Sequence, residues 1–157
     1  MALDAELQIV DSQVVDVSEG TNQLSTAGGS VEGTNLLTLG RRGIPRDATF
    51  VVNIEAVTAA AAGANVIPVQ FILQVSNDGG SAYVDVCTIT LTLAASLARV
   101  GIWSKAIGLV DSRQEVRLTG DQVVRVNVTY TNNGETDDFT YSAYIAGPNP
   151  YPSDDIA

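Results

Sequence analysis

The sequence of 157 residues contains no histidine and only one cysteine, Cys87, and these two shortages exclude much of enzyme chemistry. Without histidine there is no Ser-His-Asp or Cys-His nucleophile, and the commonest ligand for transition metals is missing. A single cysteine forms neither an internal disulfide nor a zinc site built from several thiolates. Cys87 lies in a strand-like pattern, where a small buried core residue is the ordinary interpretation. The sequence therefore predicts a protein that is not an enzyme and has no cofactor.

Charged residues are also scarce. They make up 17% of the chain, against about 25% in ordinary globular domains. Their balance is acidic, with a net charge of −10, and Lys105 is the only lysine. Such a surface repels phosphate backbones and anionic bilayers, so neither nucleic acid nor a membrane is an expected partner. The low charge content and the 45% of hydrophobic residues are consistent with a protein whose surface is largely in contact with neighbouring subunits. A monomer rich in Ala and Val is the open alternative.

Long hydrophobic runs are missing as well. The most apolar window, Val57 to Val69, is interrupted by Gly63, Asn65 and Pro68, and it is too short to span a bilayer. No basic segment precedes an apolar run near the start of the chain, so a signal peptide is not expected. The sequence also has no Gly-Lys-Ser/Thr phosphate loop and no GxGxxG motif.

What the sequence does contain is the period-2 alternation typical of β-strands. It is clearest from Val66 to Leu93, where two alternating stretches flank the turn at 76–81 and predict a long hairpin. Asp85 interrupts the apolar register of the second stretch. The residues expected on the buried face are Val69, Phe71, Leu73, Val75, Tyr83, Cys87, Ile89 and Leu91.

Further strands are expected at 48–57, 122–131 and 139–146, with shorter ones at 3–10 (continued at 13–17), 35–39 and 114–118. A short helical turn followed by an edge strand is expected within 94–109. The inward faces of the three longer strands are Phe50, Val52, Ile54 and Ala56; Val124, Val126, Val128 and Tyr130; and Phe139, Tyr141, Ala143 and Ile145. About eight strands and no long helix predict an all-β, single-domain antiparallel β-sandwich or jelly roll. Residues 35–147 are expected to form this sandwich. Residues 1–34 are expected to form an N-terminal arm and Ser/Gly-rich loop, packing on the sandwich or on a neighbour, and 148–157 an extended Pro-rich tail.

Two acidic sets carry the remaining chemical possibilities. Glu55, Asp85 and Glu115 are candidates for the paired carboxylates of a glycosidase, with solvated strand-face charges as the simpler interpretation. The loop at 132–138 has oxygen ligands suited to Ca²⁺, but its spacing matches no EF-hand, and a solvated hairpin turn is the simpler interpretation.

The opening Met1 to Gln13 contains Leu-Asp, then Leu-Gln, then Asp-x-Gln ahead of a Ser/Thr/Gly-rich stretch. Three further blocks follow at Phe50 to Ile54, Val69 to Asp78 and Arg125 to Tyr130. In their order and rough spacing, these four blocks resemble a family of capsid cement (decoration) proteins of tailed bacteriophages. The alanine-rich segment 59–64 and the Pro-rich tail do not match the family pattern.

The resemblance implies a structural virion protein on a β-sandwich or jelly roll, without catalysis or cofactor. Such a protein is made in the host cytoplasm and binds the outer capsid surface, where it stabilises contacts between major capsid protein subunits. Its expected partners are the major capsid protein and itself, as a homodimer or homotrimer. The expected contact residues lie in the arm and the tail, with frayed termini as the alternative: Leu3, Leu7, Ile9, Pro148, Pro150 and Tyr151.

The alternative function is a carbohydrate- or receptor-binding jelly-roll module of a virion or cell surface. It is motivated by the expected fold and by four aromatic residues suited to stacking on a ligand: Trp103, Tyr83, Tyr141 and Tyr144.

Overall fold

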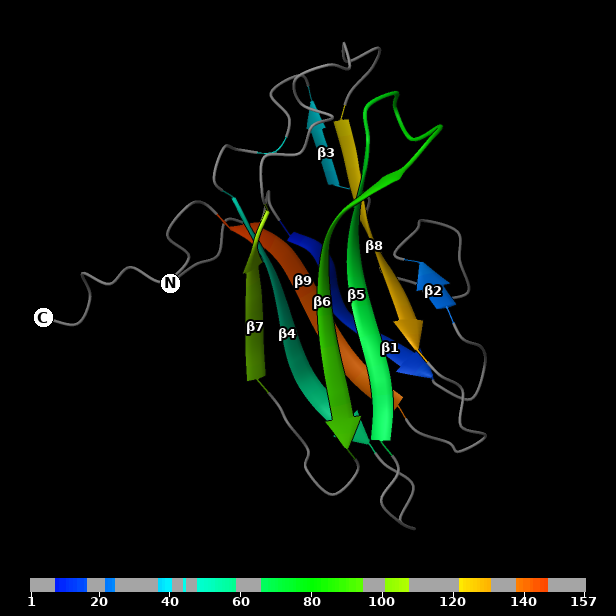
Figure 1. Ribbon diagram of the computed structural model, residues 1–157, viewed down its shortest axis with the longest axis vertical. Coiled ribbons are helices and arrows are strands. Elements are labelled where there is room, and N and C mark those ends of the chain that lie inside the picture. Colours follow the sequence, from blue (N-terminus) through cyan, green and yellow to red (C-terminus); the bar gives the residue numbers. More distant parts are fainter. Residues whose placement is uncertain are drawn as a thin grey trace, which may run out of the picture.

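The computed structural model describes residues 8–16, 22–24, 37–40, 44, 48–58, 66–94, 101–107, 122–130 and 138–146. Within these ranges the chain forms nine β-strands and no helix (Figure 1). The strands are β1 (Gln8–Asp16), β2 (Asn22–Leu24), β3 (Leu37–Gly40), β4 (Thr49–Thr58), β5 (Val66–Ser76), β6 (Val84–Ala94), β7 (Gly101–Ala106), β8 (Gln122–Tyr130) and β9 (Asp138–Ala146). Nothing in the described part of the chain is a helix long and apolar enough to cross a bilayer.

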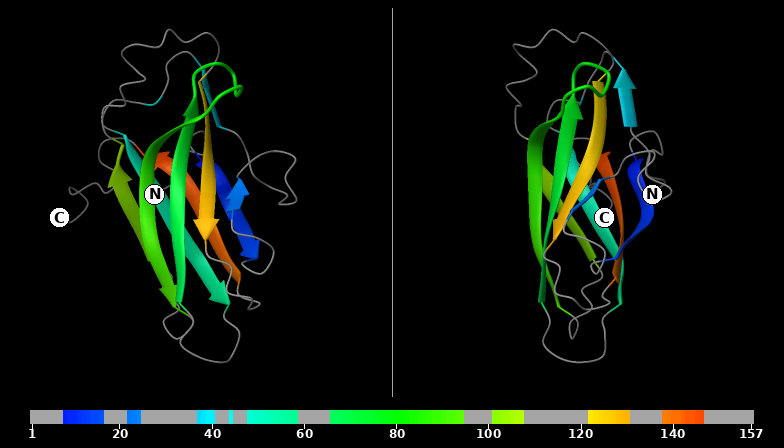
Figure 2. Two further views of the ribbon diagram at one scale, coloured as in Figure 1. Left: turned by 45° about the vertical axis from the view of Figure 1, so that its right-hand side comes forward. Right: turned by 90° about the vertical axis from the view of Figure 1, so that its right-hand side faces the viewer.

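The strands form two antiparallel sheets that lie face to face (Figure 2). Sheet A has the order β1-β9-β4-β7. Sheet B has the order β2-β8-β5-β6, and β3 pairs with the beginning of β8, whereas β2 pairs with its later part. This is the antiparallel β-sandwich that the sequence predicts, and its strand order is compatible with a jelly roll.

The β5–β6 hairpin forms where the alternation predicts it, and side chains close its turn. Asp78 Oδ1 accepts a hydrogen bond from the Ala82 N–H at 3.0 Å, and Ser76 Oγ accepts one from the Gly80 N–H at 2.9 Å. The Ser76 hydroxyl, followed by the Ala82 N–H, holds the pKa of Asp78 below its usual value. Gly79 and Gly80 have φ values of 75° and 102°, which residues with a Cβ rarely adopt. The turn residues therefore fix the geometry of the hairpin.

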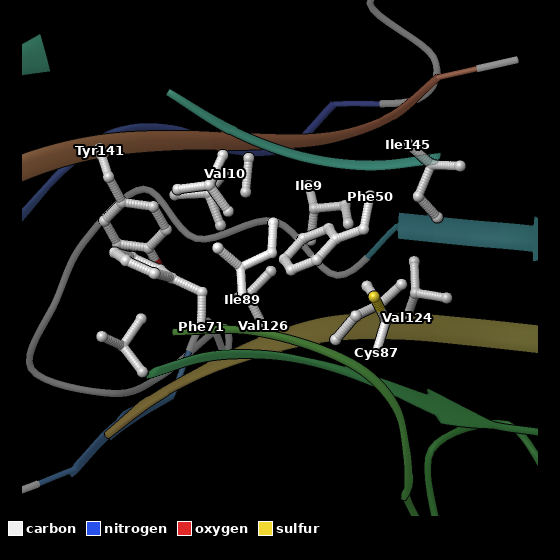
Figure 3. Close-up of a cluster of buried hydrophobic side chains, with 14 of the residues drawn as sticks. Ile9, Val10, Phe50, Phe71, Cys87, Ile89, Val124, Val126, Tyr141 and Ile145 are labelled. Carbon is white, nitrogen blue, oxygen red and sulfur yellow. The ribbon is translucent and has the colours of Figure 1, made fainter. Parts of the chain in front are cut away.

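The core lies between the sheets and is built from alternate side chains of the strands (Figure 3). Phe71 of sheet B packs between two rings of sheet A, with centroid distances of 6.0 Å to Phe139 and 5.0 Å to Tyr141. The predicted inward faces of β5, β8 and β9 are all confirmed: Val69, Phe71, Leu73 and Val75; Val124, Val126, Val128 and Tyr130; and Phe139, Tyr141, Ala143 and Ile145.

Two irregularities in strand pairing change which side chains face the core. In β4 the register with β9 shifts between Ile54 and Ala56, so Ala56 is exposed and Val57 packs against the core instead. The expectation that Ala56 faces inward is therefore wrong. The pairing of β6 with β5 also contains a bulge. Leu73 pairs with Cys87, but the next residue, Gln74, pairs with Asp85, so one residue of β6 between them is skipped. A bulge of this kind turns Asp85 to the outer face, which accommodates its charge in a strand without other charged residues.

The N-terminal segment supplies strands to the sandwich. β1 is an edge strand of sheet A, and Ile9, Val10 and Val15 are buried in the core at 0%, 1% and 0% exposure. β2 adds to the edge of sheet B. The sandwich thus includes parts of the range 1–34 that was expected to be an arm, and its boundary does not lie at residue 35.

The predictions of short strands are confirmed only in part. β7 is the edge strand expected within 94–109, and β3 lies close to the strand expected at 35–39. The strand predicted at 114–118 and the tail at 148–157 lie outside the described residues.

Candidate functional site

The contact residues predicted from the sequence are only partly within the described residues. Ile9 is fully buried in the core of its own chain. The prediction that Ile9 contacts a neighbouring subunit is therefore corrected, because its side chain is used in the sandwich. The other predicted contacts lie outside the described residues: Leu3, Leu7, Pro148, Pro150 and Tyr151.

The Glu55 carboxylate connects the edge strand β1 to the rest of sheet A through hydrogen bonds. Glu55 on β4 accepts hydrogen bonds from the hydroxyls of Ser12 on β1, at 2.7 Å, and of Ser142 on β9. The Ser12 N–H in turn donates to Ser142 Oγ at 3.0 Å. Ser12 has a φ of 46°, in the left-handed region, and sits where the pairing of β1 with β9 is irregular. The cluster therefore stabilises a kinked edge strand through three strands of the sheet.

The outer surface of sheet B is a mostly polar face, here called the sheet-B face. Three rows of side chains cross β6, β5 and β8, which lie side by side in Figure 1. Strand register gives the rows as Thr90, Gln70 and Thr129; Thr88, Ile72 and Asn127; and Asp85, Gln74 and Arg125. Hydroxyl and amide groups dominate this face, so it is suited to hydrogen bonding rather than to burial of apolar surface.

The third row is a connected network. Gln74 Nε2 donates to Asp85 Oδ1 at 2.7 Å, and Arg125 Nε donates to Gln74 Oε1 at 2.8 Å. The Arg125 guanidinium lies over the Tyr83 ring, with 3.6 Å between Cζ and the ring centroid. A Cβ at Gly80 would lie 3.2 Å from the Tyr83 hydroxyl, so Tyr83 rests close against the turn. The expectation that Tyr83 faces inward is wrong, because it packs on Arg125 and the turn.

The candidate glycosidase carboxylates do not come together. Glu55 lies on the outer face of sheet A with Ser142, whereas Asp85 lies on the sheet-B face with Gln74. The two carboxylates are thus separated by the whole sandwich, so they do not form an acid–nucleophile pair across one bond. Glu115 lies outside the described residues.

The four aromatic residues suggested for ligand stacking are also dispersed. Tyr141 is fully buried, and burial raises its pKa far above the usual value near 10. Trp103 packs against the core from β7, and Tyr83 covers Arg125 on the other sheet. Tyr144 is half-buried on β9. They do not form the single aromatic platform that the alternative function requires.

Cys87 has the predicted core position. It is 7% exposed in the core cluster, and burial raises the pKa of its thiol. Nearby, Lys105 Nζ donates to the Thr88 carbonyl at 2.9 Å. This contact occupies a backbone acceptor on β6, which is an edge strand, and a lysine at such an edge discourages pairing with another strand.

The described residues hold no group of three or more His, Cys, Asp or Glu side chains placed to share a metal ion. The possible Ca²⁺ loop at 132–137 lies outside these residues, and Asp138 is the first residue of β9.

Sequence reasoning missed Arg125 and Gln74 as members of a site. Both lie at outward-facing positions of strands in which apolar and polar residues alternate. A polar side chain at such a position is ordinarily exposed to solvent. The available signal was one long cationic side chain within the apolar run at 122–130. Its network partners are distant in sequence, 51 residues away at Gln74 and less far at Tyr83, and only strand pairing brings them together.

Comparison with known proteins does not assign the chain to a family. No family model matches the chain, and a search of curated proteins found no match. Among solved structures, the chain is similar to a variant of xylanase 10C from Cellvibrio japonicus in complex with xylopentaose. The TM-score is 0.42 and the identity 14%, over 88% of this chain and 27% of the xylanase chain. This likeness assigns neither a fold family nor a ligand to the present chain.

Proposed function

We propose that this chain is a capsid cement protein, which binds the outer surface of a tailed-bacteriophage capsid and stabilises contacts between major capsid protein subunits. The observation that carries the proposal is the match between the resembling blocks and the scaffold of the sandwich. The opening block ends within β1, and the others fall on β4, on β5 with its turn, and on β8. These strands supply much of the core, so the resemblance concerns residues that determine the fold.

The distribution of exposed apolar side chains also supports a role in contacts between subunits. The large hydrophobic residues exposed among the described residues are Val14, Val84 and Ile102, at 53%, 56% and 51%. They lie on β1, β6 and β7, which are edge strands of the two sheets. Edge strands are where a sandwich offers backbone and side chains to a neighbour.

A capsid offers many equivalent positions, so contacts that are weak individually add up when copies of a cement protein associate with one another. In this proposal the chain forms a homodimer or homotrimer on the shell. The proposed contacts with neighbours remain Leu3, Leu7, Pro148, Pro150 and Tyr151, together with the exposed edge positions.

The alternative of a carbohydrate-binding module is less well supported. It depended on aromatic residues that lie in the core, on sheet A and on the sheet-B face. No described surface carries two of them as a stacking platform.

The proposal is tested by co-sedimentation of the purified chain with capsids of the phage that encodes it. We expect the full chain to pellet with capsids, and a variant lacking residues 1–7 to bind more weakly because Leu3 and Leu7 are removed. Since β1 begins at Gln8, this variant should unfold at the same denaturant concentration as the full chain. Failure of the full chain to bind the capsids would reject the proposal.

A further inference from the structure

Arg125 is a cationic group held in one orientation on the sheet-B face. The residue is half-buried on β8, between Gln74 on β5 and the edge of the sheet formed by β2 and β3. The Tyr83 ring supports one face of its guanidinium, and Gln74 Oε1 accepts from its Nε at 2.8 Å. An arginine fixed in this way loses little side-chain entropy when it binds a ligand.

Most of the hydrogen-bonding capacity of Arg125 is not used by the residues that the structure describes. A guanidinium has five N–H donors, and within the described part of the chain only the Nε–H has a partner. Asp85, the nearest carboxylate of the network, accepts from Gln74 instead of from the guanidinium. The two terminal amino groups therefore remain as a planar pair of donors without an anionic partner among these residues.

We propose that Arg125, positioned by Tyr83 and Gln74, is a binding site for the carboxylate of an aspartate or glutamate side chain on a protein partner. The charges are complementary, and a guanidinium binds a carboxylate through two parallel hydrogen bonds. Arginine and tyrosine are also the residues that most often dominate the energy of protein interfaces. The proposal does not depend on the capsid function.

The surroundings of Arg125 favour a protein over an acidic saccharide. The hydroxyl and amide groups of the rows beside it suit the polar rim of a protein interface. A sugar ring would need a free aromatic face. Tyr83 is the aromatic residue of this face within the described ranges, and the guanidinium already covers its ring.

The test is an NMR titration of the full-length chain at low ionic strength, with N-acetylglutamate amide as the probe. We expect saturable shifts of the backbone amides of Gln74, Tyr83 and Arg125, and no such shifts with N-acetylglutamine amide, which lacks the charge. Arg125→Lys keeps the charge but loses the planar fork, so it should weaken binding at least about threefold. Tyr83→Leu should weaken binding as well, with the thermal unfolding curve checking that the fold is retained.

Lys105→Gln is the matched control for Arg125→Gln, because both remove one positive charge and Lys105 lies on β7 in the other sheet. If the two variants weaken binding equally, the probe responds to net charge alone and the proposal fails. Absence of saturable shifts would also overturn it. Methyl glucuronide forms a third arm, and binding about tenfold tighter than the glutamate probe would assign the site to an acidic saccharide instead.

Discussion

At the scale of single residues, the aromatic group around Phe71 connects the two sheets most directly. Its ring contacts Phe139 edge-on, at an interplanar angle of 78°, and packs against Tyr141 at 57°. Tilted and edge-to-face pairs of this kind add to the free energy gained by burial alone. The sandwich should therefore be especially sensitive to loss of this ring.

Phe71→Ala should lower the free energy of unfolding by about 3–5 kcal/mol, because it removes a fully buried ring and leaves a cavity. Ile102→Ala is the control, since Ile102 is 51% exposed and should change the free energy of unfolding by less than about 0.5 kcal/mol. Urea unfolding measures both values. Equal effects of the two variants would show that Phe71 is not central to the core.

Tyr141 should make stability depend on pH in the alkaline range. Burial raises its pKa in the folded state above the value near 10 of an exposed tyrosine. Above that pH the unfolded chain releases the phenolic proton while the folded chain retains it, so unfolding becomes easier as pH rises. The contribution of the Tyr141 phenol to the free energy of unfolding is fully present below about pH 10. Above about pH 10 it is lost at up to about 1.4 kcal/mol per pH unit.

The comparison is urea unfolding of the wild type and Tyr141→Phe from pH 8 to pH 11.5. The variant should show a shallower decline above pH 10. At neutral pH it loses the hydrogen bond from the hydroxyl to Gln13 Oε1, which is worth about 1 kcal/mol. Parallel declines for the two proteins would mean that Tyr141 ionises as easily in the folded state as in the unfolded chain.

At the scale of strands, alternation in the sequence predicts regular elements well and irregular ones poorly. β8 and β9 follow period 2 along the positions expected to face inward, so their core residues could be read from the sequence. β4 does not, because a shift in register after Ile54 exposes Ala56. Such a shift depends on how β9 pairs with β4, and this pairing is not encoded in the local pattern of β4.

The side-chain clusters were less predictable than the strands that carry them. Glu55 is 43 residues from Ser12 and 87 from Ser142, and their hydrogen bonds exist because β1, β9 and β4 are neighbours. The sequence indicated that Glu55 lies on a strand face, but it could not indicate which strands flank that face. The same limit applies to Arg125 and its partners.

Glu55→Ala should loosen β1 while leaving the rest of the sandwich in place. The substitution removes the acceptor of the Ser12 and Ser142 hydroxyls, and edge strands open locally more easily than central ones. We expect the backbone amides at Gln13–Val15 to exchange with solvent at least about tenfold faster, which corresponds to about 1.4 kcal/mol of local stability. Native-state hydrogen exchange measures this.

Asp85→Ala is the matched control for Glu55→Ala. It removes a carboxylate from the other outer face, where one hydrogen bond from Gln74 is lost. Exchange in β1 should then remain unchanged. Equal acceleration in β1 and β5 after Glu55→Ala would contradict the account, because it would report loss of global stability instead of release of one strand.

At the scale of the whole molecule, the described structure is a two-sheet sandwich whose outer faces differ. The outer face of sheet A carries the Glu55 cluster that holds the edge strand, whereas the sheet-B face carries polar rows that end at Arg125. Exposed apolar side chains stand singly on three edge strands. Such a distribution is suited to contacts at several edges and faces, which the proposed capsid function requires.

The central claim is that the chain occupies the outer surface of a capsid. Cryo-electron microscopy of mature particles of the proposed phage source tests this most directly, with mass spectrometry of the same particles to count copies. The account predicts density for the two-sheet sandwich on the outside of the shell, bridging major capsid protein subunits, at a fixed ratio to those subunits. Particles that lack the chain, or that carry it only in the tail or inside the shell, would contradict the account.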